Sequence, residues 1–510
     1  MPNIVLTTLN AKYIHTAFGL RYLFANLEGL RSDALILEFD INQRPNDIVE
    51  MLLAQHPRIV GIGVYIWNVA LCTEVVAILK QICPSVTLVV GGPEVSFEFE
   101  DQQIVELADY VITGEADLEF AKLCRQFLNG ERPTSKVIHG GTPDLGKLAL
   151  PYGYYDERDI LNRVIYVEAS RGCPFSCEFC LSSLDVSVRP FPLDVLLGQF
   201  QGLLDRGVNR FKFVDRTFNL NIGTSKKLLE FFYERYRPEM FLHFEMIPDR
   251  LPEALREPIS LFPPGALQFE IGIQTLNGEV GARIKRRQNL ERAAENFRFL
   301  REQTGVHIHA DLIVGLPGET IESFGRGFDR LVGLEPQEIQ VGILKRLRGT
   351  PISRHDTDWG MVYSRRPPYE VLKNSHIDFS AMQSLRRFAR YWDLVANSGN
   401  FVRTTPRIWQ GEVSPFESFL RWSEWLFSQV GRTHGIALVR LFEFLFNYLT
   451  QCLGQSEVEV AQALWEDYQR GGRNDKPLFL KAWLSERLGV SSRGRAAGIP
   501  RRQARHIGGN

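Results

Sequence analysis

The sequence has few cysteines, no long apolar run and almost no net charge. Its 510 residues include seven cysteines and carry a formal charge of −1. No stretch approaches the roughly 18 uninterrupted apolar residues of a membrane-spanning helix, and the balanced charge gives no overall field to attract nucleic acid or an anionic membrane. The opening residues, MPNIVLTTLN, lack the basic start and apolar core of a signal peptide. We therefore expect a cytoplasmic protein with no membrane partner, and nucleic acid is not an expected partner.

The chain is too long for one hydrophobic core, because single cores stop growing at roughly 250 to 300 residues. Its composition, with 44% hydrophobic, 11% aromatic and 23% charged residues, is that of an ordinary folded protein. We therefore expect two or three domains.

Residues 1–130 alternate short apolar runs with amphipathic helical stretches. The runs predicted as strands are 3–9, 35–40, 59–67, 86–92 and 110–114. Strands separated by helices indicate an α/β fold with a doubly wound parallel sheet, which binds ligands at the carboxyl ends of its strands. The segment after the first strand, TTLNAKYIHTAFG, does not contain G-x-G-x-x-G, so we do not expect a dinucleotide there.

A second series of strands follows residues 131–160, which are rich in Gly, Pro and charge and are predicted to be a linker. These strands are 164–170, 210–215, 242–246, 267–273, 306–314 and 338–344. Six strand–helix repeats within residues 161–350 predict a partial (β/α)6 barrel whose chemistry lies at the carboxyl ends of its strands. Residues 351–490 have helical periodicity and are expected to cover the substrate, and the basic tail 491–510 is expected to be disordered.

Three of the seven cysteines lie in one short segment, SRGCPFSCEFCLSS (170–183), directly after the first barrel strand. Cys173, Cys177 and Cys180 could hold three irons of a 4Fe-4S cluster and leave the fourth iron open to an outside ligand. The alternative is zinc, which would need a fourth ligand such as one of the histidines at 139, 243, 307 and 309. The remaining cysteines lie singly among apolar neighbours and are expected to be small buried side chains.

The segment CPFSCEFC after the first of six βα units resembles the CxxxCxxC motif of the radical S-adenosylmethionine (SAM) superfamily. The likeness covers about residues 160–350. It implies that the open iron binds the amino and carboxylate groups of S-adenosylmethionine, and that an electron delivered through the cluster cleaves it to a 5'-deoxyadenosyl radical. It also implies a small-molecule substrate and an electron donor such as flavodoxin or ferredoxin.

The same resemblance implies which residues contact S-adenosylmethionine. Phe179 would lie beside the adenine, and Asp215, Arg216, Thr217 and Asn219 occupy the position where relatives carry a glycine-rich turn that holds the methionine amino group. Further contacts are expected from Glu245, Glu270 and Gln274 on the third and fourth strands, unless these form a solvated strand end or a buried ion pair. The GLPGET turn, with Gly315 and Pro317, would let the backbone approach the adenine.

The order of the domains resembles radical SAM enzymes that carry a cobalamin-binding domain before the barrel. This implies that Gly91, Gly92, Pro93 and Glu94 lie near the cobalamin nucleotide tail, and that Gly114 and Glu115 contact cobalamin or the domain interface. The Asp-x-His-x-x-Gly segment of cobalamin mutases is not present, because Tyr13 precedes His15. Either His15 ligates cobalt, or the lower face of cobalamin has no histidine and is crowded by Asn10, Tyr65 or Trp67.

The segments LNAKYIHT, GGPEVS, VDRTFN and YWDLVANSG together resemble a subfamily of these enzymes that has a C-terminal domain of unknown function. The cofactors implied are a 4Fe-4S cluster, S-adenosylmethionine and cobalamin, and the reaction expected is methylation of an unactivated carbon or phosphorus centre. One alternative is an oxidative cyclisation or rearrangement without methyl transfer. An alternative of another class is a zinc-stabilised RNA-binding protein.

Overall fold

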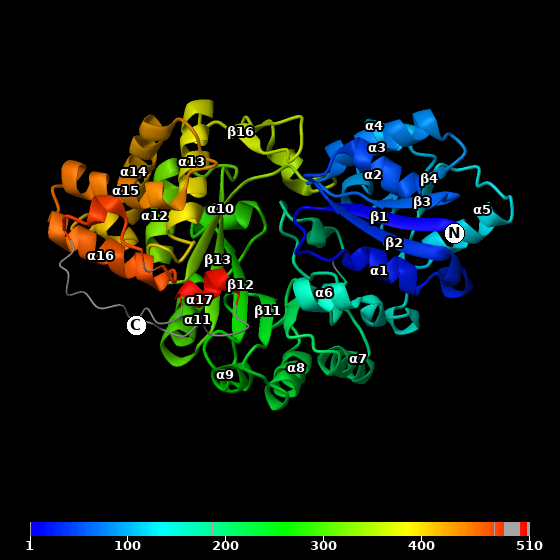
Figure 1. Ribbon diagram of the computed structural model, residues 1–510, viewed down its shortest axis with the longest axis horizontal. Coiled ribbons are helices and arrows are strands. Elements are labelled where there is room, and N and C mark those ends of the chain that lie inside the picture. Colours follow the sequence, from blue (N-terminus) through cyan, green and yellow to red (C-terminus); the bar gives the residue numbers. More distant parts are fainter. Residues whose placement is uncertain (1, 186, 474, 484–499, 507–510) are drawn as a thin grey trace. The chain divides into compact units, whose positions relative to one another are not determined.

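The computed structural model describes residues 2–185, 187–473, 475–483 and 500–506 (Figure 1). The chain forms two compact units. The first comprises Met1–Arg216, Lys345–Ser353 and Ser364–Glu370, and the second comprises Thr217–Leu344, Arg354–Tyr363 and Val371–Asn510. Among the described residues, no helix combines the length and the apolar character needed to cross a membrane.

The first unit begins with a six-stranded parallel sheet in the order β2-β1-β3-β4-β5-β6. The strands are β1 (Ile4–Asn10), β2 (Ala34–Asp40), β3 (Ile59–Gly63), β4 (Thr87–Gly91), β5 (Tyr110–Thr113) and β6 (Val137–His139). Every residue of β1 is buried, as expected for a central strand with both faces covered. The chain reverses its direction across the sheet between β1 and β3, and such switch points form the ligand crevice of doubly wound folds.

Helices cover both faces of this sheet and bury a separate apolar core on each. They are α1 (Phe18–Ala25), α2 (Pro45–Leu53), α3 (Val69–Ile82), α4 (Gln103–Leu107) and α5 (Glu119–Leu128). One core joins the sheet to α2, α3 and α4, and the other joins it to α1 and α5. Figure 1 shows α1 on the opposite side of the sheet from α2, α3 and α4. The predicted doubly wound domain is confirmed.

The stretch predicted as a linker contributes regular structure. Its residues 137–139 form β6, which pairs with β5, and α6 (Glu157–Asn162) follows. The strand β6 was not predicted, because a three-residue edge strand produces almost no periodic signal within a segment of linker composition. The first unit then continues through β7 (Ile165–Val167), β8 (Ser170–Arg171), β9 (Arg189–Pro190), α7 (Leu193–Asp205) and β10 (Arg210–Phe213), and β10 pairs with β7 in parallel.

The second unit contains four parallel strands in the order β14-β13-β12-β11. They are β11 (Phe241–Met246), β12 (Leu267–Gln274), β13 (His307–Val314) and β14 (Glu338–Ile343). The helices beside them are α8 (Ile222–Glu234), α9 (Glu253–Ser260), α10 (Gly278–Arg283), α11 (Leu290–Gln303) and α12 (Ile321–Val332). With β7 and β10 of the first unit, all six strands predicted for the barrel are present.

The C-terminal part of the second unit is mainly helical, as predicted. It contains the short pair β15 (Val362–Tyr363) and β16 (Val371–Lys373), then α13 (Phe379–Val395), α14 (Pro415–Val430), α15 (Leu438–Asn447) and α16 (Glu457–Arg470). Six residues of the tail that was expected to be disordered form a further helix, α17 (Arg501–His506). The rest of that tail, apart from Pro500, lies outside the described residues.

Candidate functional site

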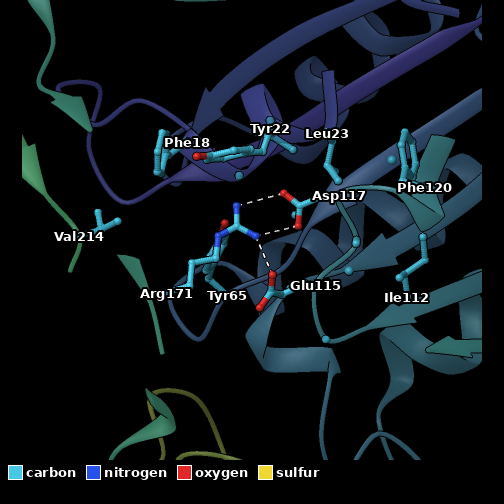
Figure 2. Close-up of a pocket in the computed structure, with 18 of the residues that line it drawn as sticks. Phe18, Tyr22, Leu23, Tyr65, Ile112, Glu115, Asp117, Phe120, Arg171 and Val214 are labelled. Carbon is cyan, nitrogen blue, oxygen red and sulfur yellow. Dashed lines mark hydrogen bonds and ion pairs between the residues drawn. The ribbon is translucent and has the colours of Figure 1, made fainter. Parts of the chain in front are cut away.

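The first unit has a cavity of about 400 Å³ at the carboxyl ends of β3, β4 and β5. Figure 2 shows apolar side chains from α1 and α5 on its walls and a cluster of charged side chains beside them. Its lining includes Phe18, Tyr22, Leu23, Tyr65, Ile112, Phe120, Glu115, Asp117, Glu168 and Arg171. Small-molecule sites have volumes of roughly 300 to 1,000 Å³, so the cavity suits a small ligand or one part of a larger one.

Glycine backbone forms the part of the cavity that belongs to the sheet. Gly92 has a φ of 115°, and a Cβ at this position would lie 2.5 Å from the carbonyl oxygen of Val64. Only glycine fits there without displacing the neighbouring strand. Six of the residues predicted to bind cofactor line this cavity together, namely Tyr65, Gly91, Gly92, Gly114, Glu115 and Arg216.

Asn68 fixes the edge of the sheet between β1 and β3. Its side-chain amide donates to the carbonyl oxygens of Leu9 (3.1 Å) and Gly63 (3.2 Å), and its Oδ1 accepts from the N–H of Tyr65 (2.7 Å). Trp67 stacks on Tyr65 with ring centroids 4.5 Å apart and an interplanar angle of 7°. The indole is 47% exposed, so an aromatic platform lies open at the switch point of the sheet.

Three other predicted residues bind their neighbours and are not among the described residues that line the cavity. Asn10 donates to Glu38 (2.7 Å), and the exposed Tyr13 accepts from Arg158 (2.7 Å). His15 shares a hydrogen bond of 2.7 Å between its Nδ1 and the Tyr166 hydroxyl. Burial, followed by nearby cations, lowers the pKa of His15 and favours the neutral ring.

Glu94 is also engaged within the protein. Its Oε1 accepts from Arg348 Nε (2.9 Å) and from the Tyr369 hydroxyl (2.6 Å), and only 4% of the residue is exposed. Pro93 begins the short 3-10 turn that contains Glu94. These contacts anchor the segments 345–353 and 364–370 to the turn after β4.

The three clustered cysteines lie in a loop that is closed at its base. β8 and β9 pair antiparallel on either side of it, and the Cys173 N–H donates to the Asp185 carbonyl (3.0 Å). Gly172 has a φ of 91°, and a Cβ there would overlap the carbonyl oxygen of Ser187. The backbone that leads into Cys173 is therefore tightly packed.

The donor set of this loop suits an iron–sulfur cluster. Cys173 and Cys177 are buried, Cys180 is half-buried, and in the described part of the chain no cysteine forms a disulfide. Across the described part of the chain, no group of three or more His, Cys, Asp or Glu side chains is placed to hold a metal ion. A four-iron cluster takes one thiolate per iron, so its ligands surround a cube rather than a single ion. By contrast, burial raises the pKa of the Cys124 thiol to about 12 and that of Cys72 further, which marks both as inert.

Arg171 connects the cysteine loop to the cavity. Its Nη1 donates to Glu115 (2.7 Å) and Asp117 (3.0 Å), and its Nε donates to Glu168 (3.1 Å). Figure 2 shows the guanidinium between Asp117 and Glu115 on the cavity wall. Burial alone would lower the pKa of Arg171, but the adjacent carboxylates outweigh it and raise that pKa, so the side chain is cationic.

Asp215 fastens the end of β10 to the same loop. Its carboxylate accepts from the Ala169 N–H (2.9 Å) and the Ser170 hydroxyl (2.6 Å), and burial raises its pKa although these hydrogen bonds oppose the change. The adjacent Arg216 lines the cavity. In the second unit, Asn219 is fully buried and its Oδ1 accepts from the Ile247 N–H (2.8 Å), which a structural role explains.

One face of the second unit's sheet carries a row of ionisable side chains. Adjacent strands place Glu245 beside Glu270, Glu270 beside His309, and His309 beside Glu338. Burial would lower the pKa of His309, but Asp311, Glu338 and Glu270 outweigh it and raise that pKa. Part of this row forms ion pairs within the protein, because Glu270 lies 3.0 Å from His243 Nε2 and Glu338 lies 2.8 Å from Arg502 Nε.

Three family models match the chain at separate places. The radical SAM superfamily matches residues 167–331, the B12 binding domain matches residues 4–124, and the protein of unknown function DUF4080 matches residues 357–494. The chain therefore contains a radical SAM domain and a B12-binding domain. The first match implies S-adenosylmethionine and a 4Fe-4S cluster, and the second implies cobalamin.

A solved structure of the radical SAM methyltransferase TsrM from Kitasatospora setae, with cobalamin and a [4Fe-4S] cluster bound, has the same fold over 69% of this chain and 74% of TsrM. The TM-score is 0.56 and the identity is 18%. The uncharacterized methyltransferase PH0819 of Pyrococcus horikoshii is 24% identical over 54% of this chain and 64% of its own length. A tRNA-2-methylthio-N(6)-dimethylallyladenosine synthase of Acinetobacter baylyi is 24% identical over 54% of this chain and 59% of its own length. The matches therefore span less than two thirds of either curated relative.

Within the radical SAM domain, Gln274 and Gly315 show contrasting surroundings. Gln274 has a φ of 69° at an irregularity in the pairing of β12, and its buried Oε1 accepts no hydrogen bond from the described residues. A strained residue with an unsatisfied polar atom is typical of a ligand site. A Cβ at Gly315 would lie 2.7 Å from Val371, so packing against the C-terminal part of the unit also requires a glycine there.

Sequence reasoning assigned no contact with S-adenosylmethionine to several polar residues of the radical SAM domain. Glu319 in the GLPGET turn is buried and accepts from the Thr275 hydroxyl (2.6 Å), and burial raises its pKa to about 7. His309 and Asp311 lie on the face of the second unit's sheet that carries the row of ionisable side chains. His309 Nε2 is 3.3 Å from Asp311 Oδ1. The alternation of polar and apolar letters in VHIHADLIV was the signal that could have found them. Arg171 had no comparable signal.

Proposed function

We propose that this enzyme transfers a methyl group to an unactivated carbon or phosphorus centre of a small molecule, with cobalamin and S-adenosylmethionine as cofactors. The observation that carries the proposal is that one compact unit contains both the cavity of the B12-binding sheet and the three-cysteine loop. The name of TsrM as a methyltransferase, and that of PH0819, support methyl transfer as the reaction.

The cavity would hold the nucleotide tail of cobalamin. Its volume of about 400 Å³ is suited to one part of that cofactor. Gly91 and Gly92 let the backbone of β4 come close to the ligand, while Tyr22 and Phe120 supply apolar contact. The stacked Trp67 and Tyr65 would lie at the open edge of the sheet, where a broad apolar surface can pack against a planar ring.

The cysteine loop of the first unit would serve S-adenosylmethionine. Bound cofactors supply the chemistry of this reaction, namely reductive cleavage of S-adenosylmethionine at the cluster and methyl transfer through cobalt. Cys173, Cys177 and Cys180 would hold the cluster, with an electron donor such as flavodoxin or ferredoxin as partner. In the second unit, Gln274, Glu245 and Glu270 stay predicted contacts of S-adenosylmethionine on the resemblance to radical SAM enzymes alone.

Anaerobic reconstitution with iron, sulfide and hydroxocobalamin tests this function. With S-adenosylmethionine and a reductant, extracts that contain the substrate should yield both S-adenosylhomocysteine and 5'-deoxyadenosine. A cyclase or rearrangement enzyme would form 5'-deoxyadenosine without S-adenosylhomocysteine. The triple variant C173A/C177A/C180A is the control and should form neither product. Comparison of metabolites from cells with and without the protein would then identify the methylated product.

A further inference from the structure

Two arginines connect the turn after β5 to the cysteine loop. Arg171 contacts Glu115 and Asp117 of that turn, as described above. Arg189 of β9, which pairs with Arg171 in the β8–β9 ladder, also donates to Glu115 and contacts Asp185 (3.1 Å). The Asp185 carbonyl in turn accepts from the N–H of Cys173. The turn Gly114–Asp117 is therefore bound to both ends of the loop that carries the cysteines.

The connection between the turn and the cysteine loop is a cluster of opposite charges beside the cavity. Four carboxylates, those of Glu115, Asp117, Glu168 and Asp185, surround two guanidinium groups. Burial raises the pKa of Glu168 to about 7, and Arg171 is the strongest opposing influence. Displacement of the guanidinium would leave several carboxylates without a close counter-charge, so the group must move together with its partners.

The link from Arg171 to the cysteines is short and stiff. Only Gly172 separates Arg171 from Cys173, and its backbone is packed against Ser187 on the other side of the loop. The bidentate contact of the Arg171 guanidinium with the Asp117 carboxylate also fixes the direction of the Arg171 side chain, because two parallel hydrogen bonds restrict rotation. Movement of Asp117 would therefore be transmitted to the backbone of Cys173.

The same residues form a wall of the cavity. Gly114, Glu115, Asp117 and Arg171 all line it. A ligand in the cavity contacts this turn directly, so its binding energy can depend on the position of the turn. Buried ion pairs are often replaceable by apolar side chains without loss of stability, so stability alone does not require this cluster of charges.

We propose that Arg171 is a positioning residue that couples cobalamin binding in the cavity to the geometry of the cysteine loop, and thereby to S-adenosylmethionine binding at the cluster. This inference rests on the cofactors of the proposed function. Because coupling between two sites is reciprocal, each cofactor should tighten the binding of the other by the same factor. Arg189 supports the same turn from the second strand of the ladder.

The test measures the dissociation constant of S-adenosylmethionine on the reconstituted full-length protein with its cluster oxidised, with and without saturating hydroxocobalamin. For the unsubstituted protein we expect hydroxocobalamin to lower this constant by at least about fivefold, the lower end of ordinary coupling. R171Q should reduce the factor to below about twofold while iron content and hydroxocobalamin stoichiometry stay unchanged. R171K keeps the charge without the bidentate geometry, so its factor should lie between these two values.

A second variant keeps the proposal testable if R171Q does not fold. E115Q preserves side-chain shape and removes one carboxylate shared by both arginines, and it should lower the coupling factor. R125Q is the matched control, because Arg125 forms an exposed ion pair with Glu28 on the same unit. It should keep the full factor. The low-temperature electron paramagnetic resonance spectrum of the reduced cluster should change when hydroxocobalamin is added. R171Q should abolish this change.

The inference is overturned if hydroxocobalamin leaves the S-adenosylmethionine constant of the unsubstituted protein unchanged, or if R171Q and E115Q both retain its full factor. These results differ from a failure of the proposed function. In that case the unsubstituted protein would bind no hydroxocobalamin or assemble no iron–sulfur cluster.

Discussion

Replacement of Glu319 by glutamine should make the protein more stable at alkaline pH and little changed at acidic pH. The Glu319 carboxyl is 2% exposed, accepts one hydrogen bond from Thr275, and has an Oε2 atom with no hydrogen-bond partner in the described residues. A charged carboxylate in this position is poorly solvated. Glutamine has nearly the same shape, can still accept from Thr275, and carries no charge.

The magnitude follows from the pKa. Burial raises the pKa of Glu319 from 4.5 to about 7, so the native state holds the proton more tightly than the unfolded state does. The free energy of unfolding therefore falls as the pH rises from about 4.5 to about 7 and is level above that. A pKa rise of this size lowers the free energy of unfolding by roughly 3 kcal/mol at pH 8. E319Q should restore most of this loss.

Urea denaturation of the full chain at about pH 4 and pH 8, followed by circular dichroism, measures this difference. E319Q should have a higher midpoint than the unsubstituted protein at the higher pH and a similar midpoint at the lower one. The control is E322Q, since Glu322 lies three residues further on, at an exposed position of α12. Parallel pH dependence of E319Q and the unsubstituted protein would refute the reasoning.

Two further substitutions test the cofactor cavity. G92A should weaken hydroxocobalamin binding at least about tenfold in a spectroscopic titration, since a 1.4 kcal/mol loss suffices and the Cβ would lie 2.5 Å from Val64. G130A, also at positive φ but with open space around it, should bind normally. N68A should lower the free energy of unfolding by about 1 to 3 kcal/mol in urea, because it removes two hydrogen bonds to the carbonyls of β1 and β3 and leaves the Tyr65 N–H without its acceptor. An unchanged midpoint would contradict this assignment.

Except for β6, the strands of both sheets could be predicted from sequence because each is a continuous or alternating run of apolar residues. The strand β6 could not, since Val137–His139 is stabilised by pairing with β5 rather than by its own pattern. Likewise α17 consists of six mostly polar residues, and the contact of Arg502 with Glu338 (2.8 Å) joins positions far apart in the chain.

The cavity was partly predictable because glycines directly after parallel strands mark the carboxyl edge of a sheet. Gly91, Gly92 and Gly114 were found in this way. Arg171 was not, because its importance depends on Glu115 and Asp117, more than fifty residues earlier, and no local pattern joins them. The contact of Glu94 with Arg348 could not be predicted for the same reason, since the two residues are 254 positions apart in the sequence.

The central claim is that three thiolates hold an iron–sulfur cluster beside a cobalamin site. Iron and acid-labile sulfide, measured on anaerobically reconstituted protein and on C173A/C177A/C180A, test it most directly. We expect about four irons and four sulfides per chain in the unsubstituted protein and nearly none in the variant. Zinc in place of iron, or a variant that remains fully loaded with iron, would contradict it.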